Sequence, residues 1–343
     1  MRKKPLKLRM APVVVAIAAA LLAISANAST IYTFQTLDNA GDPAFNQLLG
    51  INSSTSPTIV GYFGDGSAVP NSGYSLAPPT SYTNENFPGS TQTQVTGITP
   101  NSPTTTVGFY VDGSGNNFGF VDQGGSFTSV ANPGTPVTTP STNQLLGVND
   151  SGQAVGFYVD GSGHAQAYLF DIGHATYTLI AFPGATSTTA TGINDAGLIT
   201  GFYTDAMGGT HGFIDNGGTF TSYDDPGGTG TMFLGINGSD EAVGSYVDGS
   251  GVTEGLLFNL GSDSYQTLDD PSGSATTAFG VTGTTINGIN NAGDLVGFYS
   301  DGTNVNGFLA TPAPTPEPKM ISLLLIGVAL MIGRNLRSRR PIG

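Results

Sequence analysis

A Gly-Ile-Asn tripeptide, or a close variant of it, recurs six times along the chain. The glycines that open the six copies are separated by 47, 50, 45, 43 and 53 residues; they are Gly50, Gly97, Gly147, Gly192, Gly235 and Gly288. Self-similarity at such a period is typical of repeat architectures, in which each repeat is one supersecondary unit. The repeat therefore constrains the fold more than any other feature of the sequence.

Each repeat contains four short runs rich in Val, Ile, Thr, Tyr and Phe, separated by turns of Gly, Asp, Asn and Pro. The second run carries a Gly-aromatic-aromatic triplet, as in Gly156-Phe157-Tyr158, and a turn with Asp160 follows it. These are signals of strands and hairpins. No stretch between the chain's ends shows a capped helical period. Four antiparallel strands in about 45 residues predict one blade of a β-propeller.

The number of repeats predicts an all-β, six-bladed propeller spanning residues 29–310. The sixth repeat has only three runs, at 286–290, 295–299 and 305–310, whereas the segment 34–38 matches the fourth run of the fifth repeat at 265–269. We therefore expect the first strand in sequence to complete the last blade, which removes exposed sheet edges. An open β array and two stacked sheets are the alternatives.

Apart from three histidines, basic side chains are confined to the two ends of the chain. The ten Lys and Arg residues are Arg2, Lys3, Lys4, Lys7, Arg9, Lys319, Arg334, Arg337, Arg339 and Arg340, and all 24 acidic residues lie between the two groups. A body without Lys or Arg excludes nucleic acid as a direct partner, because phosphate neutralisation needs cations. It also predicts a domain without ion pairs. Cysteine is absent, so no disulfide supports the fold.

The N-terminus has the order of a secretory signal peptide over residues 1–28. Its basic start is followed by an apolar run and then by the small-residue site Ala26-Asn27-Ala28, which predicts cleavage before Ser29. The alternative is a retained membrane anchor, although the run is shorter than the roughly 20 residues of a spanning helix.

The C-terminus combines three features. A Pro-rich linker at 311–318 ends in Pro316-Glu317-Pro318, and a tail at 319–343 contains an apolar stretch closed by an arginine cluster. Arg334, Arg337, Arg339 and Arg340 would remain cytoplasmic and stop transfer of a transmembrane helix. This order resembles the PEP-CTERM sorting tail of Gram-negative bacteria. The resemblance implies an exosortase as processing enzyme, beside signal peptidase, and delivery through the inner membrane to the cell surface or exopolysaccharide matrix. A plain C-terminal anchor is the alternative.

The repeats themselves resemble the bacterial extracellular repeats of the HAF type, through their Gly-x-Asn and Val-Gly elements. That resemblance implies an exported propeller-like module and no defined activity. We accordingly expect a non-catalytic structural or binding module associated with the cell surface or matrix.

One aspartate per repeat follows the second run, and these residues form a candidate acidic rim. They are Asp65, Asp112, Asp160, Asp205, Asp248 and Asp301. Carboxylates there would bind cations or sugar hydroxyls, whereas the simpler interpretation is turn chemistry. The same choice applies to the asparagines of the tripeptide, Asn52, Asn149, Asn194, Asn237 and Asn290. We predict no cofactor and no metal centre, because a calcium loop motif is lacking, although a calcium-stabilised adhesin stays open.

The alternative function is a carbohydrate-active enzyme, either a glycosidase or a lyase, acting on exopolysaccharide. Glycoside hydrolysis needs two positioned carboxyl groups, and Glu85, Glu241 and Glu254 are the acids outside the repeat pattern. His164, His174 and His211 show no zinc-ligand spacing. Nothing in the sequence marks a catalytic residue.

Overall fold

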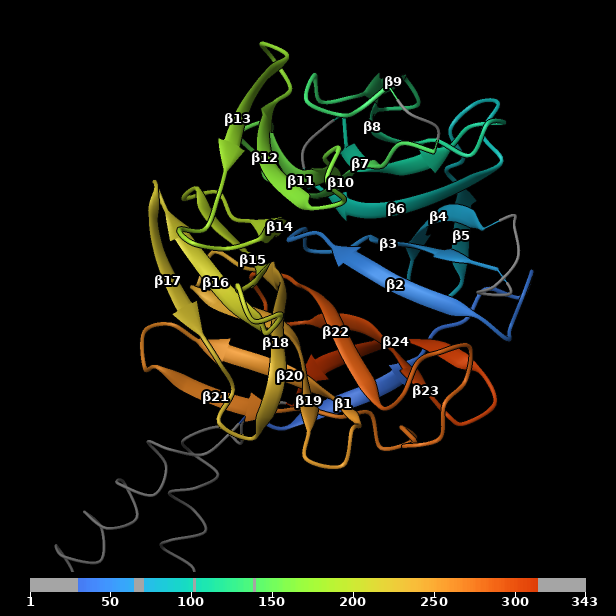
Figure 1. Ribbon diagram of the computed structural model, residues 1–343. Helices are drawn as coiled ribbons and strands as arrows, with labels where there is room; N and C mark the ends of the chain where they lie inside the picture. Colours follow the sequence, from blue (N-terminus) through green and yellow to red (C-terminus); the bar gives the residue numbers. More distant parts are fainter. Residues whose placement is uncertain (1–29, 65–70, 101–102, 138–139, 314–343) are drawn as a thin grey trace, which may run out of the picture. The chain divides into compact units, whose positions relative to one another are not determined.

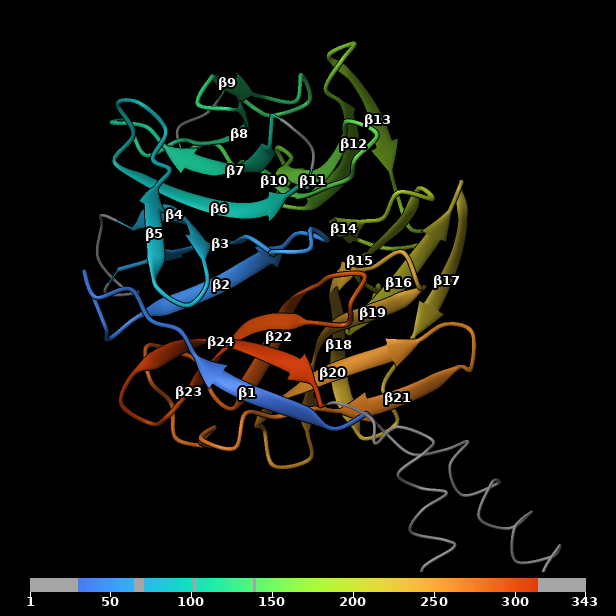
Figure 2. The same ribbon diagram turned by 180° about the vertical axis from the view of Figure 1, so that it is seen from behind.

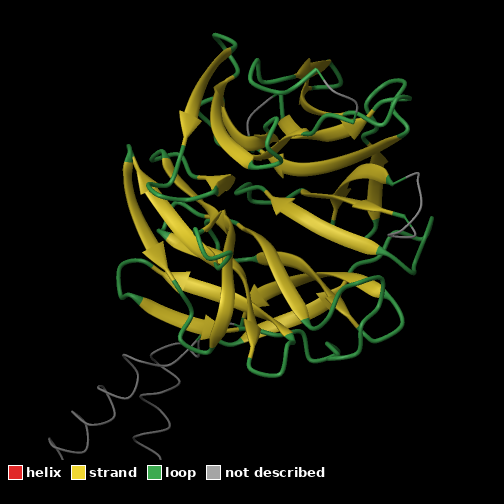
Figure 3. Cartoon of the chain, viewed as in Figure 1, coloured by secondary structure: helices red, strands yellow, loops and turns green. Residues whose placement is uncertain are grey.

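The computed structural model describes residues 30–64, 71–100, 103–137 and 140–313. These ranges contain strands, turns and loops (Figure 3). Their 24 strands form six antiparallel sheets of four strands each. The compact unit covers Phe34–Thr311, and the first strand begins two residues before it, at Tyr32. Within the described ranges no helix has the length and apolar character needed to cross a membrane.

Five blades are built from consecutive strands (Figure 1). Blade 1 comprises β2 (Asn46–Ile51), β3 (Ile59–Phe63), β4 (Ser72–Ala77) and β5 (Ser81–Asn84). Blade 2 comprises β6 (Gln92–Ile98), β7 (Thr105–Val111), β8 (Asn117–Gln123) and β9 (Phe127–Val130). Blade 3 comprises β10 (Asn143–Val148), β11 (Gln153–Val159), β12 (Ala165–Asp171) and β13 (Thr176–Ile180). Blade 4 comprises β14 (Ser187–Ile193), β15 (Leu198–Thr204), β16 (Thr210–Asn216) and β17 (Thr219–Tyr223), and blade 5 comprises β18 (Gly228–Ile236), β19 (Glu241–Asp248), β20 (Thr253–Asn259) and β21 (Ser264–Thr267).

The sixth blade joins the two ends of the described chain. It contains β22 (Thr284–Ile289), β23 (Leu295–Ser300) and β24 (Val305–Pro312), and β1 (Tyr32–Thr36) pairs with β24 as its outer strand (Figure 2). The Phe34 ring packs on Phe308 at a centroid distance of 5.4 Å, and the backbone NH of Leu37 donates to the carbonyl of Gly307 at 2.8 Å. The six-bladed fold and its closure by the N-terminal strand are therefore confirmed, and the open array and stacked sheets are wrong. The predicted signal peptide and C-terminal helix lie outside the described residues.

The first strand of each blade lines a narrow central channel. Each of these strands carries a β-bulge immediately before the glycine of the repeated tripeptide. A Cβ atom on Gly147 would lie 2.7 Å from the carbonyl oxygen of Thr191 and 3.0 Å from the Cα of Gly192 in the next blade. Glycine recurs here because neighbouring backbones approach too closely around the channel for a side chain.

The loop between blades is held by a second repeated contact. The backbone NH of Phe182 donates to the buried Thr188 Oγ1 at 3.1 Å, and a buried Asn or Thr accepts the equivalent NH in the other blades. These acceptors are Asn46, Thr93, Asn143, Thr188, Thr231 and Thr284. Buried polar side chains thus anchor the loop that leads into each blade.

Candidate functional site

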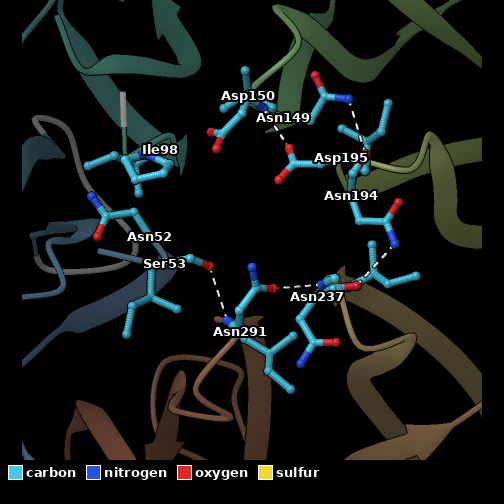
Figure 4. Close-up of a pocket in the computed structure, with 16 residues that line it drawn as sticks. Asn52, Ser53, Ile98, Asn149, Asp150, Asn194, Asp195, Asn237 and Asn291 are labelled. Carbon is cyan, nitrogen blue, oxygen red and sulfur yellow. Dashed lines mark hydrogen bonds between the residues drawn. The ribbon is translucent and has the colours of Figure 1, made fainter. Parts of the chain in front are cut away.

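One end of the channel opens into a polar cavity where the first strands finish (Figure 4). The cavity has a volume of about 80 Å³. Its apolar lining consists of Ile51, Ile98, Val148, Ile193, Ile236 and Ile289. This volume admits several water molecules, so it suits a hydrated ion or the edge of a saccharide rather than an enclosed substrate.

The asparagines of the repeated tripeptide join neighbouring blades around this mouth. Asn194 Nδ2 donates to the backbone carbonyl of Asn237 at 3.0 Å. Its Oδ1 accepts the backbone NH groups of Ala196 and Leu198 at 3.1 and 3.0 Å. Asn149, Asn237 and Asn290 likewise donate to the carbonyl of the next blade and accept two NH groups of their own turn. Asn52 Nδ2 lies 3.5 Å from the carbonyl of Thr99, the residue that replaces asparagine in blade 2. These amide groups are engaged in local hydrogen bonds, as the turn interpretation expects.

The next residue of each blade forms the outer rim of the mouth, and here the six blades differ. The rim residues are Ser53, Pro100, Asp150, Asp195, Gly238 and Asn291. Asp195 Oδ1 accepts the backbone NH of Asp150 at 2.8 Å, and on the other side Ser53 Oγ accepts the NH of Asn291 at 3.1 Å (Figure 4). Burial, and then the charge of Asp195, raises the pKa of Asp150. The rim therefore has one acidic side and one neutral, hydrogen-bonding side.

A groove of about 440 Å³ on blades 2 and 3 adjoins the mouth. It is lined by Thr99, Pro103, Thr105, Gln123, Asn149, Asp150, Ser151, Gly152 and Ile172, and two of these, Asn149 and Asp150, also line the mouth. Sequence reasoning missed this site because its residues belong to ordinary turns. The sequence signal that could have indicated this site is that the residue after the repeated asparagine differs from blade to blade.

The predicted acidic rim lies at the opposite end of the blades, because the second strand runs back from the asparagine turn to the aspartate turn. Asp65 lies outside the described residues. In each of the other five the Oδ1 atom accepts two backbone NH groups of its own turn, at 2.7 to 3.0 Å. The backbone hydrogen bond from His164 leads those that lower the pKa of Asp160. Across the described ranges, no three acidic or histidine side chains gather to hold a metal ion.

The three acids outside the repeat pattern lie in three different environments. Glu241 Oε2 accepts a hydrogen bond from Asn237 Nδ2 at 2.8 Å, a role that Gln153 and Asp294 fill in their own blades. Glu241 therefore supports the asparagine turn of its blade and follows the repeat pattern at this position. Glu85 follows the outer strand of blade 1 and lines neither the mouth nor the groove.

Glu254 forms a carboxyl pair with Asp269. A hydrogen bond that protonated Glu254 donates to Asp269, followed by burial and by the charge of Asp269, raises the pKa of Glu254 to about 7. A glycosidase holds its carboxyl groups roughly 5–9.5 Å apart, with the scissile bond between them. Two carboxyl groups in direct hydrogen bond leave no room for that bond, so this pair does not form a glycosidase site.

The prediction of a domain without ion pairs is wrong at histidine. His211 Nδ1 lies 2.9 Å from Asp224 Oδ1, and its Nε2 lies 3.4 Å from Asp205 Oδ2. Partial burial alone would lower the pKa of His211, but the hydrogen bond and charge of Asp224, with those of Asp205, raise it. The ring also stacks on Tyr203 at a centroid distance of 5.1 Å. When it is protonated, His211 provides a positive charge in a body that has no Lys or Arg.

No protein family model matches the chain, and no curated protein matches its sequence. Solved structures do match its fold. The lectin of Aleuria aurantia, a fungal six-bladed propeller that recognises fucose, is similar over 83% of this chain and 100% of its own, with a TM-score of 0.52 and 12% identity. A point mutant of that lectin in complex with α-methyl-L-fucoside gives a TM-score of 0.50 at 11% identity, over 83% of this chain and 99% of that chain.

A sialidase of Trypanosoma rangeli is also similar, with a TM-score of 0.49 and 7% identity, over 82% of this chain and 60% of that chain. The likeness to the two lectin structures, at 11–12% identity, shows a shared propeller fold and nothing finer. Since fold alone does not specify function, activity has to be argued from the site.

Proposed function

We propose that this protein is an exported, non-catalytic binding protein of the cell surface or matrix, and that its propeller binds a neutral, hydroxyl-rich polymer such as exopolysaccharide. The observation that carries the proposal is the pair of adjoining polar concavities that share Asn149 and Asp150. The groove would hold the length of a glycan, and the mouth would hold one edge of a residue.

The chemistry of the lining suits such a ligand. The Asp150 carboxylate accepts hydrogen bonds, and the amide of Gln123 and the hydroxyls of Ser151 and Thr105 both donate and accept them. Sugar hydroxyls require both kinds of partner. The body lacks Lys and Arg, so it has no fixed side-chain charge to attract a polyanion. The fucose-binding lectin of the same fold supports carbohydrate as the ligand class.

Export is proposed from the two ends of the chain. The basic and apolar N-terminus would start secretion, and the Pro316-Glu317-Pro318 tail with its arginine cluster would serve as an exosortase sorting signal. Cell fractionation with mass spectrometry of both mature termini tests this part. Cytoplasmic protein that retains Met1 would refute it.

Glycan-array binding of the full-length protein tests the ligand class, and variants test the location. Because a hydrogen bond to a charged group contributes about 1.5–3 kcal/mol, we expect Asp150→Asn to weaken binding about tenfold or more. The matched control is Asp248→Asn at the opposite end of the blades, which should bind as the wild type does. Loss of binding in the control alone would move the site to the acidic rim, and absence of any glycan binding would refute the proposal.

A further inference from the structure

The interface between blades 1 and 2 is polar at four positions where the other blade interfaces are almost entirely apolar. These positions are Ser75 on β4, Glu85 just after β5, Thr106 on β7 and Asp122 on β8. The strand registers identify the equivalent residue in every blade. Each of the four residues can therefore be compared with the residue at the same position in the other five blades.

The equivalents of Ser75 are Val121, Leu169, Ile214, Leu257 and Leu309. Those of Glu85 are Leu37, Val130, Ile180, Tyr223 and Leu268. Those of Thr106 are Ile59, Ala154, Ile199, Ala242 and Leu295. Those of Asp122 are Leu76, Phe170, Asp215, Phe258 and Ala310. Among the twenty equivalents Asp215 is the single acidic residue, and Tyr223 is the one other that carries a polar atom.

The apolar equivalents pack together across the blade boundary. Val130 of blade 2 lies in one hydrophobic cluster with Ala154 and Phe170 of blade 3. Leu37, Ile59 and Leu76 share a cluster in the same way at the junction of blades 6 and 1. By this equivalence, Glu85 faces Thr106 and Asp122 from the neighbouring blade.

The four polar side chains are close to one another. Thr106 and Asp122 are direct cross-strand partners on β7 and β8, so their side chains share one face of the sheet. Burial has the largest effect on Glu85 and raises its pKa, and the charge of Asp122 adds to the rise. The nearby hydroxyls of Ser75 and Thr106 act in the opposite direction and lower this pKa.

The cluster has more acceptor oxygens than donors. Thr106 and Asp122 are 3% and 7% exposed, and Thr106 Oγ1, Asp122 Oδ1 and Glu85 Oε2 are all buried without a hydrogen-bond partner of ordinary geometry. Glu85 Oε2 and Asp122 Oδ1 are buried oxygens, and a negative charge on them is stable only where a cation or a proton neutralises it. No Lys or Arg exists anywhere in the body of the chain. A cation from solution can supply the positive charge.

We propose that Ser75, Glu85, Thr106 and Asp122 form a binding site for one hard divalent cation, Ca²⁺, between blades 1 and 2. Carboxylate and hydroxyl oxygens are the ligands that Ca²⁺ takes in proteins. Both oxygens of Glu85, with one from each of the other three residues, provide five ligands, and water completes the six to eight that the ion requires. Bound there, the ion joins two blades where the rest of the propeller uses apolar packing.

The test is thermal unfolding of the full-length protein at pH 7.5 in EGTA and in CaCl₂, with calorimetric titration of Ca²⁺. We expect one bound ion, and a rise in melting temperature of about 5 °C or more once Ca²⁺ exceeds its dissociation constant about 100-fold. Glu85→Gln combined with Asp122→Asn should abolish both. Glu254→Gln, which alters the carboxyl pair with Asp269 in blade 5, is the matched control and should respond as the wild type does.

A second variant keeps the proposal testable if the double variant fails to fold. Ser75→Val, Glu85→Val, Thr106→Ala and Asp122→Phe together reproduce the interface of blades 2 and 3. We expect this protein to fold in EGTA and to ignore Ca²⁺. The proposal is overturned if wild-type melting is the same in EGTA and CaCl₂, if the apolar variant responds to Ca²⁺ as the wild type does, or if only acidification stabilises the wild type.

Discussion

Replacement of Gly147 by alanine tests the close approach of the blades around the channel. The new methyl group would lie 2.7 Å from the carbonyl oxygen of Thr191 and 3.0 Å from the Cα of Gly192. Both neighbours are backbone, so they can give way only if two blades move apart. Overpacking of this kind costs about 1–3 kcal/mol. The lower entropy of an unfolded chain with alanine offsets about 0.4–1 kcal/mol of that cost.

The net loss of about 1–2 kcal/mol corresponds to a fall in melting temperature of roughly 2–8 °C for a domain of this size. Circular dichroism during heating measures it. Gly161→Ala is the control, because a Cβ there meets nothing within 4 Å and the backbone has no left-handed φ. It should melt at or slightly above the wild-type temperature. If Gly147→Ala melts no lower than Gly161→Ala, the packing argument for the channel glycines is refuted.

Three further predictions concern hydrogen bonds and protonation. Asn194→Ala removes an inter-blade hydrogen bond and leaves two backbone NH groups without their acceptor, so denaturant titration should show a loss of about 1–3 kcal/mol; an unchanged midpoint would contradict the bridging role. The pKa of Glu254 is raised from 4.5 to about 7 in the folded protein. Its contribution to folding stability is therefore fully present below pH 4.5 and is lost as the pH rises through 7. Solvent screening should keep that contribution under about 1 kcal/mol. In Glu254→Gln the free energy of unfolding should change less between pH 4.5 and 7 than it does in the wild type. A pH profile identical to that of the wild type would refute the pairing of Glu254 with Asp269. The pKa of His211 is raised above 6.5, so its stabilising contribution is present below pH 6.5 and is lost as the pH rises through the folded value. NMR titration of the imidazole should show that Asp224→Asn lowers this pKa, and no change would contradict the ion pair.

The repeat was sufficient to predict the architecture because every blade carries the same turn and strand signals. The matching segments 34–38 and 265–269 even indicated the closing strand, since β1 pairs with β24 as expected. The end of that blade was less predictable. β24 continues to Pro312 because the backbone NH of Ala313 bonds the carbonyl of Ile31, and this contact joins residues from opposite ends of the chain.

The candidate site was poorly predicted for a related reason. Repetition draws attention to residues that every blade shares, such as Asp160 and Asn194, and these residues are engaged in turns and inter-blade hydrogen bonds. No repeat pattern in the sequence distinguished Asp150. Its proposed role in binding arises because closure of the ring brings six different turn residues to one mouth.

The sequence by itself determined the all-β fold, the number of blades and the lack of Lys and Arg in the body, because these follow from period and composition. Only the tertiary structure decided which residues meet across a blade boundary. Glu85 and Asp122 lie 37 positions apart in sequence, and no local pattern relates a residue after one blade's outer strand to a residue on the next blade's third strand. Glu85 Oε2 and Asp122 Oδ1 become buried without hydrogen-bond partners only once the blades have packed together.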